Sequence, residues 1–411
     1  MKQYNAALNL IKELNDKGFL AYIVGGYVRD KVLNIISNDI DITTNALPSE
    51  LMEFFDIKKS TANQYLSCVL SYEGFEFELT TFRMDLEYHD HRHPITAVAN
   101  NLEADLIRRD FTIDALVLDS EERIIDLFGG LDDIKNKQIK TIGNPYKRFD
   151  EDALRILRAC YLASKLQFDI EKNTLNGMIE NSKYLPLLST ERIFAELIKL
   201  LSYPGYKKGL TYLLKSNAAK YFGFTKAIDY ILKSDIKPSL DDLIVLSIYM
   251  HEAFAFKLTK MQEKTYNEAV QLAKDFNLGN EILYKYDIKA IKLANKIRAF
   301  LKEKSFDEKE IDKLYDSLPI KDRKDIVLNS EQIIAITNKS QGPWLGQLIS
   351  KIEMAIINGY LVNTKEEIIK FIKEEKYVWY RVFYILWKNQ GDKYIRWYAK
   401  YFSNIRWWDR Y

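Results

Sequence analysis

Residues 21–44 read A-Y-I-V-G-G-Y-V-R-D-K-V-L-N-I-I-S-N-D-I-D-I-T-T, and this stretch decides the fold of the N-terminal part of the chain. The apolar run A-Y-I-V before Gly25 and Gly26 predicts a buried strand that ends in a tight turn. Residues 28–36 have the apolar spacing of a helix. Residues 39–42 alternate charged and apolar side chains, which predicts a second strand.

The same stretch carries two groups that suit phosphate chemistry. A glycine turn that opens a helix exposes unpaired N–H groups at the positive end of the helix dipole, and Arg29 lies in the first turn. Asp39 and Asp41 would stand side by side on one face of the second strand, where two carboxylates suit Mg²⁺. A lone G-G is usually only a turn, and a lone D-x-D is usually a solvated strand edge. Their combination at this spacing instead implies chemistry on a nucleoside triphosphate.

The run G-G-Y-V-R-D followed by D-I-D resembles the first motif of the polymerase-β-type nucleotidyltransferases. It is more closely similar to that of the bacterial class II tRNA nucleotidyltransferases (CCA-adding enzymes) and their poly(A) polymerase relatives. The resemblance implies an α+β protein, with an N-terminal nucleotidyltransferase domain built on a small mixed sheet and an all-helical remainder. It implies four parts: a head over 1–145, a neck with a base-recognition helix over 146–205, a body over 206–330 and a tRNA-binding tail over 331–411.

Length and composition are those of an ordinary globular protein of two to four domains, with 411 residues, 47% of them hydrophobic and 29% charged. Since the net charge is only +2, a polyanion must be bound by a local basic patch. The two cysteines, Cys68 and Cys160, form no C-x-x-C pair and indicate no disulfide framework. The N-terminus does not resemble a signal peptide, and no apolar run has the length of a membrane span. We therefore expect a cytoplasmic protein.

A third acidic residue lies in a predicted pair of strands. Residues 65–72 and 74–82 read as strands around a Glu-Gly turn, and Glu78 falls on the polar face of the second strand. The run E-L-T-T-F-R, which begins at Glu78, is similar to the family's strand that carries a third carboxylate near a metal or the incoming 3′-hydroxyl. A solvated strand glutamate is the alternative explanation.

Residues 83–101 are polar without clear periodicity, which predicts a long loop. Three of the four histidines lie here, at His89, His91 and His93, but no cysteine accompanies them and zinc binding is not favoured. CCA-adding enzymes have a flexible loop here that often ends D-G-R-H-P or similar. The run D-H-R-H-P from Asp90 resembles it, with histidine where glycine is usual. Enzymes that add only the two cytidines lack much of this loop, so its presence favours full CCA addition.

The run R-R-D-F-T-I-D-A from Arg108 onward resembles the family's R-R-D-F-T-I-N-A. Two adjacent arginines beside an active site can hold triphosphate oxygens in bidentate pairs, and the alignment favours Arg109 as the nucleotide contact. Asp114 replaces the usual asparagine, which removes two amide donors. Residues 126–145 are rich in turns and correspond to the family's hinge between head and neck.

A helix is predicted from residue 149 onward, with Asp152, Arg155 and Arg158 three residues apart on one face. A surface ion-pair ladder is the ordinary explanation. However, a carboxylate only accepts hydrogen bonds and a guanidinium only donates them. Cytosine and adenine both present an amino donor beside a ring-nitrogen acceptor, and uracil and guanine present the reverse, so an Asp–Arg pair can select C and A.

The family's E-D-x-x-R motif has this selecting role, and Asp152 and Arg155 match it. By the same resemblance Arg158 would help to hold the triphosphate, and Tyr161 stands where a third arginine is usual. Residues 189–197 resemble the family's E-R-I-x-x-E-L element, which supports the neck and would begin with an N-cap at residue 190.

The chain is predicted to be helical throughout from about residue 205, and no H-D cluster indicates the phosphohydrolase domain of some relatives. Residues 376–411 hold five of the six tryptophans and eight Lys/Arg against two Asp/Glu. Basic residues interleaved with aromatics can bind RNA through phosphate contacts and stacking. Helical packing, with Trp379, Phe383 and Leu386 on one stripe, explains the same pattern.

Together these features predict template-independent addition of C, C and A to the 3′ end of tRNA from CTP and ATP, with release of diphosphate. Asp39 and Asp41 would bind two Mg²⁺, with Glu78 as the third carboxylate. An enzyme that adds only CC, only A or a poly(A) tail is the main alternative, and a non-catalytic RNA-binding protein is the alternative from another class. The oligomeric state stays open. The predicted nucleotide-binding residues are Gly25, Gly26, Arg29, Arg108, Arg109, Asp152, Arg155 and Arg158.

Overall fold

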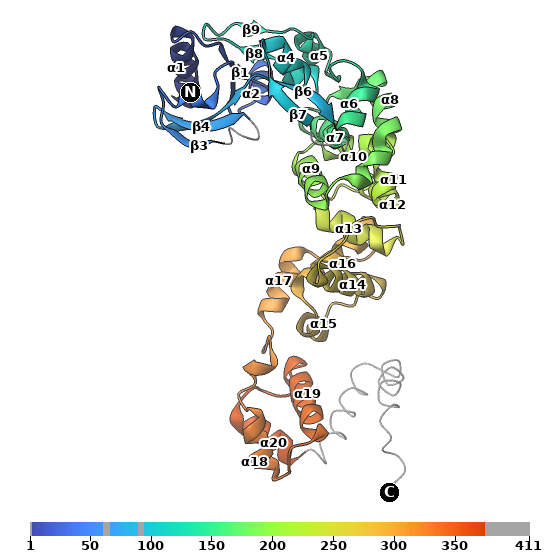
Figure 1. Ribbon diagram of the computed structural model, residues 1–411. Coiled ribbons are helices and arrows are strands. Elements are labelled where there is room, and N and C mark those ends of the chain that lie inside the picture. The colour runs from blue at the N-terminus through green and yellow to red at the C-terminus, as the bar shows by residue number, and fades with distance from the viewer. Residues whose placement is uncertain (1, 61–65, 89–93, 375–411) are drawn as a thin grey trace. The chain divides into compact units, whose positions relative to one another are not determined.

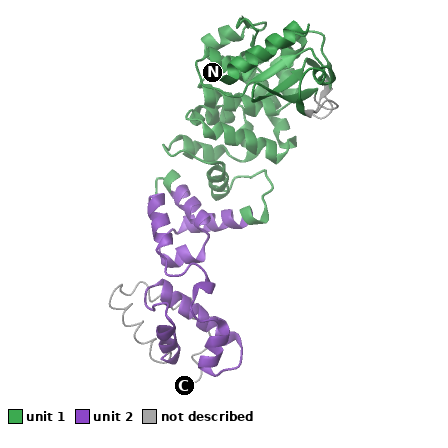
Figure 2. Ribbon diagram, turned by 90° about the vertical axis from the view of Figure 1, so that its left-hand side faces the viewer, with its two compact units in different colours: residues 1–262, 299–303 green, residues 263–298, 304–411 purple. Residues whose placement is uncertain are grey.

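A computed structural model describes residues 2–60, 66–88 and 94–374 (Figure 1). The chain forms two compact units, Met1–Gln262 with Ala299–Glu303, and Glu263–Arg298 with the chain from Lys304 onward (Figure 2). All of the predicted site residues belong to the first unit.

The first unit begins with a mixed sheet that, in the described residues, has seven strands in the order β3-β4-β5-β2-β1-β8-β9. The neighbours β2 and β5 are parallel and all other neighbours are antiparallel. The sheet confirms the predicted α+β head. Its strands are β1 (Ala21–Val24), β2 (Asp41–Thr44), β3 (Ile57–Ser60), β4 (Ser67–Tyr72), β5 (Phe75–Thr81), β8 (Val117–Leu118) and β9 (Ile124–Ile125).

Short helices pack against this sheet. Its core includes Val24, Leu106 and Val117, which are at most 1% exposed. The helix predicted over 28–36 ends earlier, because Asn34 has a left-handed φ of 57°, and Ile36 is 94% exposed rather than buried. The helices of the head are α1 (Lys2–Asp16), α2 (Gly26–Val32), α3 (Pro48–Leu51), α4 (Leu102–Ile107), α5 (Gly130–Lys135) and the 3₁₀ turn η1 (Thr112–Asp114).

The prediction of a loop over 83–101 is wrong in part, because β6 (Arg83–Tyr88) and β7 (Pro94–Val98) form an antiparallel pair of strands. This ribbon lies outside the main sheet, and Leu86 and Val98 are 56% and 43% exposed. A ribbon that buries so little needs no apolar face, so the sequence shows no alternation. The three histidines and the D-H-R motif of residues 89–93 lie outside the described residues.

The rest of the first unit is helical apart from a small parallel pair of strands (Figure 1). The helix predicted from residue 149 is in fact two helices, because Asp152 adopts an extended conformation between them. Residue 189, rather than 190, is the N-cap of α9. The elements are β10 (Gln138–Ile139), β11 (Asp169–Ile170), α6 (Pro145–Glu151), α7 (Leu154–Leu166), α8 (Lys172–Asn181), η2 (Ser182–Leu187), α9 (Thr190–Ser202), α10 (Tyr206–Lys215), α11 (Ala218–Phe222), α12 (Thr225–Leu232) and α13 (Leu240–Tyr249).

The chain stays helical as far as it is described, which confirms the prediction for its C-terminal half. In that part no helix has both the length and the apolar character that a membrane span requires. The aromatic and basic segment 376–411 lies outside the described residues. The elements here are α14 (Lys260–Lys274), α15 (Asn280–Lys285), α16 (Ile288–Phe300), α17 (Glu308–Asp316), η3 (Arg323–Asp325), α18 (Ser330–Thr337), α19 (Pro343–Ile357) and α20 (Lys365–Lys373).

Candidate active site

The glycine turn between β1 and α2 has two structural reasons to lack side chains. Gly25 has φ +80° and ψ −140°, which L residues rarely adopt. A Cβ atom on Gly25 would also lie 3.0 Å from Nη1 of Arg109. The turn therefore lies directly against the guanidinium group of Arg109.

The acidic residues gather where β2 begins. The strand starts at Asp41, so Asp39 lies just before it, yet the predicted alternation holds: Ile40 and Ile42 are 6% and 1% exposed, whereas both aspartates are exposed. In the parallel pairing of β2 with β5, Asp41 is the direct partner of Glu78. Paired residues on adjacent strands point to the same face, so these two carboxylates lie side by side.

Crowding by the neighbouring carboxylates changes the acidity of Asp41. Although Asp41 reaches solvent, the surrounding protein partly desolvates its carboxyl group. This desolvation, together with the charges of Asp39 and Glu78, raises the pKa of Asp41 to about 6, although Arg109 opposes the rise. A carboxyl group that resists ionisation because of its acidic neighbours is stabilised as an anion by a cation between them.

We next asked whether these residues fit a metal ion. Within 2–60, 66–88 and 94–374, no three His, Cys, Asp or Glu side chains are gathered closely enough to hold one alone. Mg²⁺ commonly binds through one or two carboxylates, with substrate phosphates and water as its other ligands. The exposed, hard oxygen atoms of Asp39, Asp41 and Glu78 fit a site of that kind.

The two adjacent arginines are held by Asp105, a fully buried residue of α4. Its Oδ1 accepts from Nε and Nη2 of Arg108 at 3.0 and 2.9 Å, and its Oδ2 lies 3.8 Å from Nη2 of Arg109. Oδ2 also accepts from the hydroxyl of Thr43 at 3.2 Å, which ties the arginines to β2.

Arg109 is incompletely paired. Its Nε is buried and has no hydrogen-bond partner in the described parts of the chain. Burial and the neighbouring Arg108 lower the pKa of Arg109, against the opposing effect of Asp105. A buried cation with an unused donor, beside the glycine turn and Asp41, suits an anionic ligand.

Arg29 is placed differently from the prediction of a residue in an open phosphate site. It is 3% exposed. Its Nε and Nη2 donate to Oδ1 of Asp30 at 2.9 and 2.7 Å, and its Nη1 pairs with Asp114. The departure from the usual asparagine at 114 therefore supplies a charged partner for Arg29.

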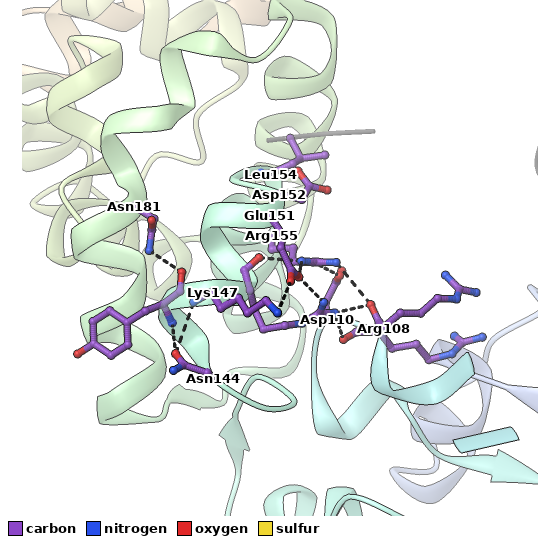
Figure 3. A network of polar contacts seen from close by, with 12 residues as sticks. Arg108, Asp110, Asn144, Lys147, Glu151, Asp152, Leu154, Arg155 and Asn181 are labelled. Atoms are coloured by element: carbon purple, nitrogen blue, oxygen red, sulfur yellow. Dashed lines mark hydrogen bonds and ion pairs between the residues drawn. The ribbon is translucent and has the colours of Figure 1, made fainter. Parts of the chain in front are cut away.

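Arg155 joins the head to the helical region (Figure 3). Its Nε donates to Oδ1 of Asp110 at 2.7 Å, and its Nη1 donates to Oε2 of Glu151 at 3.3 Å and to the carbonyl oxygen of Arg148 at 2.7 Å. Arg148 in turn donates to the carbonyl oxygen of Arg109 at 2.8 Å. The side chain of Arg155 is 5% exposed, and its guanidinium is held in this network.

The other two residues of the predicted base-selecting face lie on either side of Arg155. Asp152 accepts from the backbone N–H of Leu154 at 2.9 Å, and its Oδ2 lies 3.9 Å from Nη2 of Arg192. Burial raises the pKa of Asp152, and the charge of Arg155 opposes that rise. Arg158 is half exposed and lies 2.8 Å from Oδ2 of Asp110. The three residues come from one segment but do not form a single open face.

Several structural partners were missed from the sequence, namely Asp30, Asp105, Asp110, Arg148 and Lys165. One signal was available: Asp105 precedes Arg108 and Arg109 by three and four residues, the spacing of neighbours on a helix. The pairing of Lys165 with Asp30 spans 135 residues, and no local pattern indicates it.

Comparison with known proteins identifies the families that match this chain. The family described as Poly A polymerase head domain matches residues 21–140, and that described as Probable RNA and SrmB- binding site of polymerase A matches 167–227. The family described as tRNA nucleotidyltransferase domain 2 putative matches 255–372.

Individual relatives match along nearly their whole length. The CCA-adding enzyme of Ligilactobacillus salivarius is 34% identical over 394 residues, which cover 90% of this chain and 96% of the relative. That of Streptococcus agalactiae serotype V is 33% identical, covering 90% and 97%. The crystal structure of the Bacillus stearothermophilus CCA-adding enzyme in complex with CTP is 27% identical, with a TM-score of 0.77 and coverage of 93% and 99%.

This chain therefore belongs to the CCA-adding enzymes, the bacterial class II tRNA nucleotidyltransferases. Membership implies a nucleotidyltransferase that uses a divalent metal ion.

Proposed function

We propose that the chain adds C, C and A, without a template, to the 3′ end of tRNA, taking the nucleotides from CTP and ATP and releasing diphosphate. The observation that carries the proposal is the pairing of Asp41 with Glu78 in the head, next to the glycine turn and Arg109. The side chains proposed to bind a metal ion, a triphosphate and a base then all lie in the first compact unit of the chain.

Asp39 and Asp41 are the proposed ligands of Mg²⁺, with Glu78 beside them near the 3′-hydroxyl. When bound, the metal would lower the pKa of that hydroxyl and offset the charge that develops on the α-phosphate. The carboxylates themselves orient the site and provide the negative charge that draws the cation in.

The proposed triphosphate contacts are Arg109 and Arg158. Arg109 lies against the Gly25–Gly26 turn, and Arg158 pairs with Asp110. Arg109 contributes a positive charge and a buried N–H donor without a partner in the described residues. Arg158 contributes a positive charge on a half-exposed side chain. Arg108 is oriented by Asp105 beside Arg109. A guanidinium can bind phosphate oxygens through two parallel hydrogen bonds, which fixes the orientation of the phosphate as well as its charge.

Asp152 and Arg155 are the proposed base-selecting pair. Asp152 has an extended backbone between α6 and α7, and the charge of Arg155 acts on it. Arg155 is held by Asp110 and Glu151, so its guanidinium is preorganised and a base would meet donors that are already fixed. We also propose that the head, neck, body and tail follow the boundaries 145, 205 and 330.

The experiment uses tRNA transcripts that end before CCA, at C and at CC, each incubated with labelled CTP, ATP, UTP or GTP and Mg²⁺. We expect all three to be completed to CCA and to stop there. Products that end at CC, gain only A or grow a long A tail would assign the chain to a sister activity. Bound but unextended tRNA would indicate a non-catalytic binding protein.

A matched pair of variants tests the carboxylates. Glu78→Gln should lower kcat by at least about a hundredfold. Glu76→Gln lies two residues away on the same strand, where Glu76 pairs with Lys58 at 2.7 Å, and should retain the wild-type kcat. Equal activity of the two variants would contradict the role given to Glu78.

A further inference from the structure

A chain of four charged side chains connects α7 with α2 and η1. Nζ of Lys165 lies 2.8 Å from Oδ2 of Asp30, whose Oδ1 accepts from Arg29 at 2.7 and 2.9 Å. Arg29 pairs in turn with Asp114 of η1. We refer to Lys165, Asp30, Arg29 and Asp114 as the charge chain.

The charge chain is buried and balanced. Arg29 and Asp30 are 3% and 2% exposed, and the side chains of Lys165 and Asp114 are 16% and 19% exposed. Positive and negative groups alternate, so each charge is compensated by its neighbour. A buried ion pair adds little net stability compared with apolar packing, but it fixes the position of its partners because an unpaired buried charge is costly.

Its location gives α7 a second attachment to the head. Arg158 pairs with Asp110, and Lys165 follows Arg158 by seven residues, which is two turns or about 10 Å along the helix. Tyr161 lies between them on the same face. The Tyr161 ring packs against Tyr203 at 5.7 Å between centroids. The face of α7 that carries Arg158 and Tyr161 is thus held at both ends.

We propose that the charge chain is a positioning device for nucleotide binding, in which Lys165 and Asp114 are positioning residues. Arg29 is its central link, because carboxylates hold both sides of its guanidinium. With Lys165 attached, α7 cannot pivot about Asp110, and Arg158 stays aimed at the proposed triphosphate site without reorganisation on binding. The inference rests on the proposed nucleotidyl transfer.

The test measures kcat and KM for CTP on a transcript that ends before CCA, and for ATP on one that ends at CC. Lys165→Met removes the attachment, and Lys165→Arg keeps the charge. Lys208→Met is the matched control. Lys208 pairs with Asp169 at 2.7 Å and donates to the carbonyl oxygen of Gln167 at 2.8 Å, so it supports the end of α7 from within the helical region and makes no contact with the head among these bonds. We expect KM for both nucleotides to rise roughly tenfold in Lys165→Met, with kcat changed by less than about threefold. Lys165→Arg should restore KM, and Lys208→Met should leave it unchanged.

A second readout separates positioning from general damage. Hydrogen exchange of the C-terminal half of α7 should accelerate in Lys165→Met and return to the wild-type rate in Lys165→Arg. If Lys165→Met does not fold, Lys165→Gln, which keeps one donor for Asp30, replaces it with an expected rise in KM of about threefold.

The outcomes distinguish this inference from the proposed function. A wild-type protein that extends no transcript overturns the proposed function. An active wild type whose KM values are unchanged in the Lys165 variant, or are not restored by arginine, overturns the role of the charge chain alone.

Discussion

Asp110→Asn is the most informative single substitution, because Asp110 holds two arginines of α7. Its Oδ1 accepts from Nε of Arg155 at 2.7 Å, and its Oδ2 lies 2.8 Å from Nη1 of Arg158. The side chains of Asp110 and Arg155 are 11% and 5% exposed, whereas that of Arg158 is 50% exposed. The substitution keeps the shape of the side chain and removes its charge.

The expected cost follows from these exposures. Removing one partner of a buried ion pair typically costs about 3–5 kcal/mol, because the other charge stays buried. Glu151 remains 3.3 Å from Arg155, and the asparagine oxygen can still accept one hydrogen bond. We therefore expect a loss of about 2.5 kcal/mol in the stability of the head–neck region. Arg158→Gln removes a solvated partner and should cost less than about 1 kcal/mol.

Native-state hydrogen exchange followed by mass spectrometry measures this difference in the full chain. Peptides from α7 should exchange roughly sixtyfold faster in Asp110→Asn, since 1.4 kcal/mol corresponds to a factor of ten. Peptides from α19, in the other unit, provide the internal reference. Exchange of α7 within about threefold of wild type in Asp110→Asn, or an equal effect of Arg158→Gln, would refute the reasoning.

Further predictions concern backbone space and acidity. Gly25→Ala combines a forbidden φ of +80° with a Cβ 3.0 Å from Arg109, and should lower kcat/KM for CTP at least about tenfold. In Gly209→Ala the new Cβ would meet a backbone carbonyl oxygen of α7 at 2.7 Å, so thermal unfolding should show a loss of about 1–3 kcal/mol, whereas Gly346→Ala, which meets open space, should show none. Burial alone would raise the pKa of Asp110, but the two arginines of α7 hold it below its usual range. The free energy that ionised Asp110 adds to folding should therefore be fully present above about pH 4 and should be lost as the pH falls through the lowered pKa of Asp110. In Asp110→Asn the free energy of unfolding should depend less steeply on pH in that range.

Local sequence patterns predicted much of the head. The alternation at 39–42 correctly predicted Ile40 and Ile42 inside and the aspartates outside. The paired strands around residue 73 were also correct, and the polar face of the second carries Glu78. These predictions succeed because every second residue of a strand faces the same side, so a strand buried on one side shows alternating apolar and polar residues in the sequence. The hairpin over 83–98 was missed because it buries no continuous face.

Only the tertiary structure decided which charged groups meet. The sequence suggested Arg29 and Arg155 as ligand contacts, but it did not indicate the carboxylates that hold them. Arg29 donates to Asp30 and Arg155 donates to Asp110. Asp30 and Lys165 are 135 residues apart and still form one ion pair. Periodicity reports which face of an element is apolar, but the partner of a charged side chain depends on how distant elements pack. The sequence by itself indicated the family, the strands β1, β2, β4 and β5 and the acidic residues proposed for the site. The packing of α7 on the head decided which carboxylates hold its arginines.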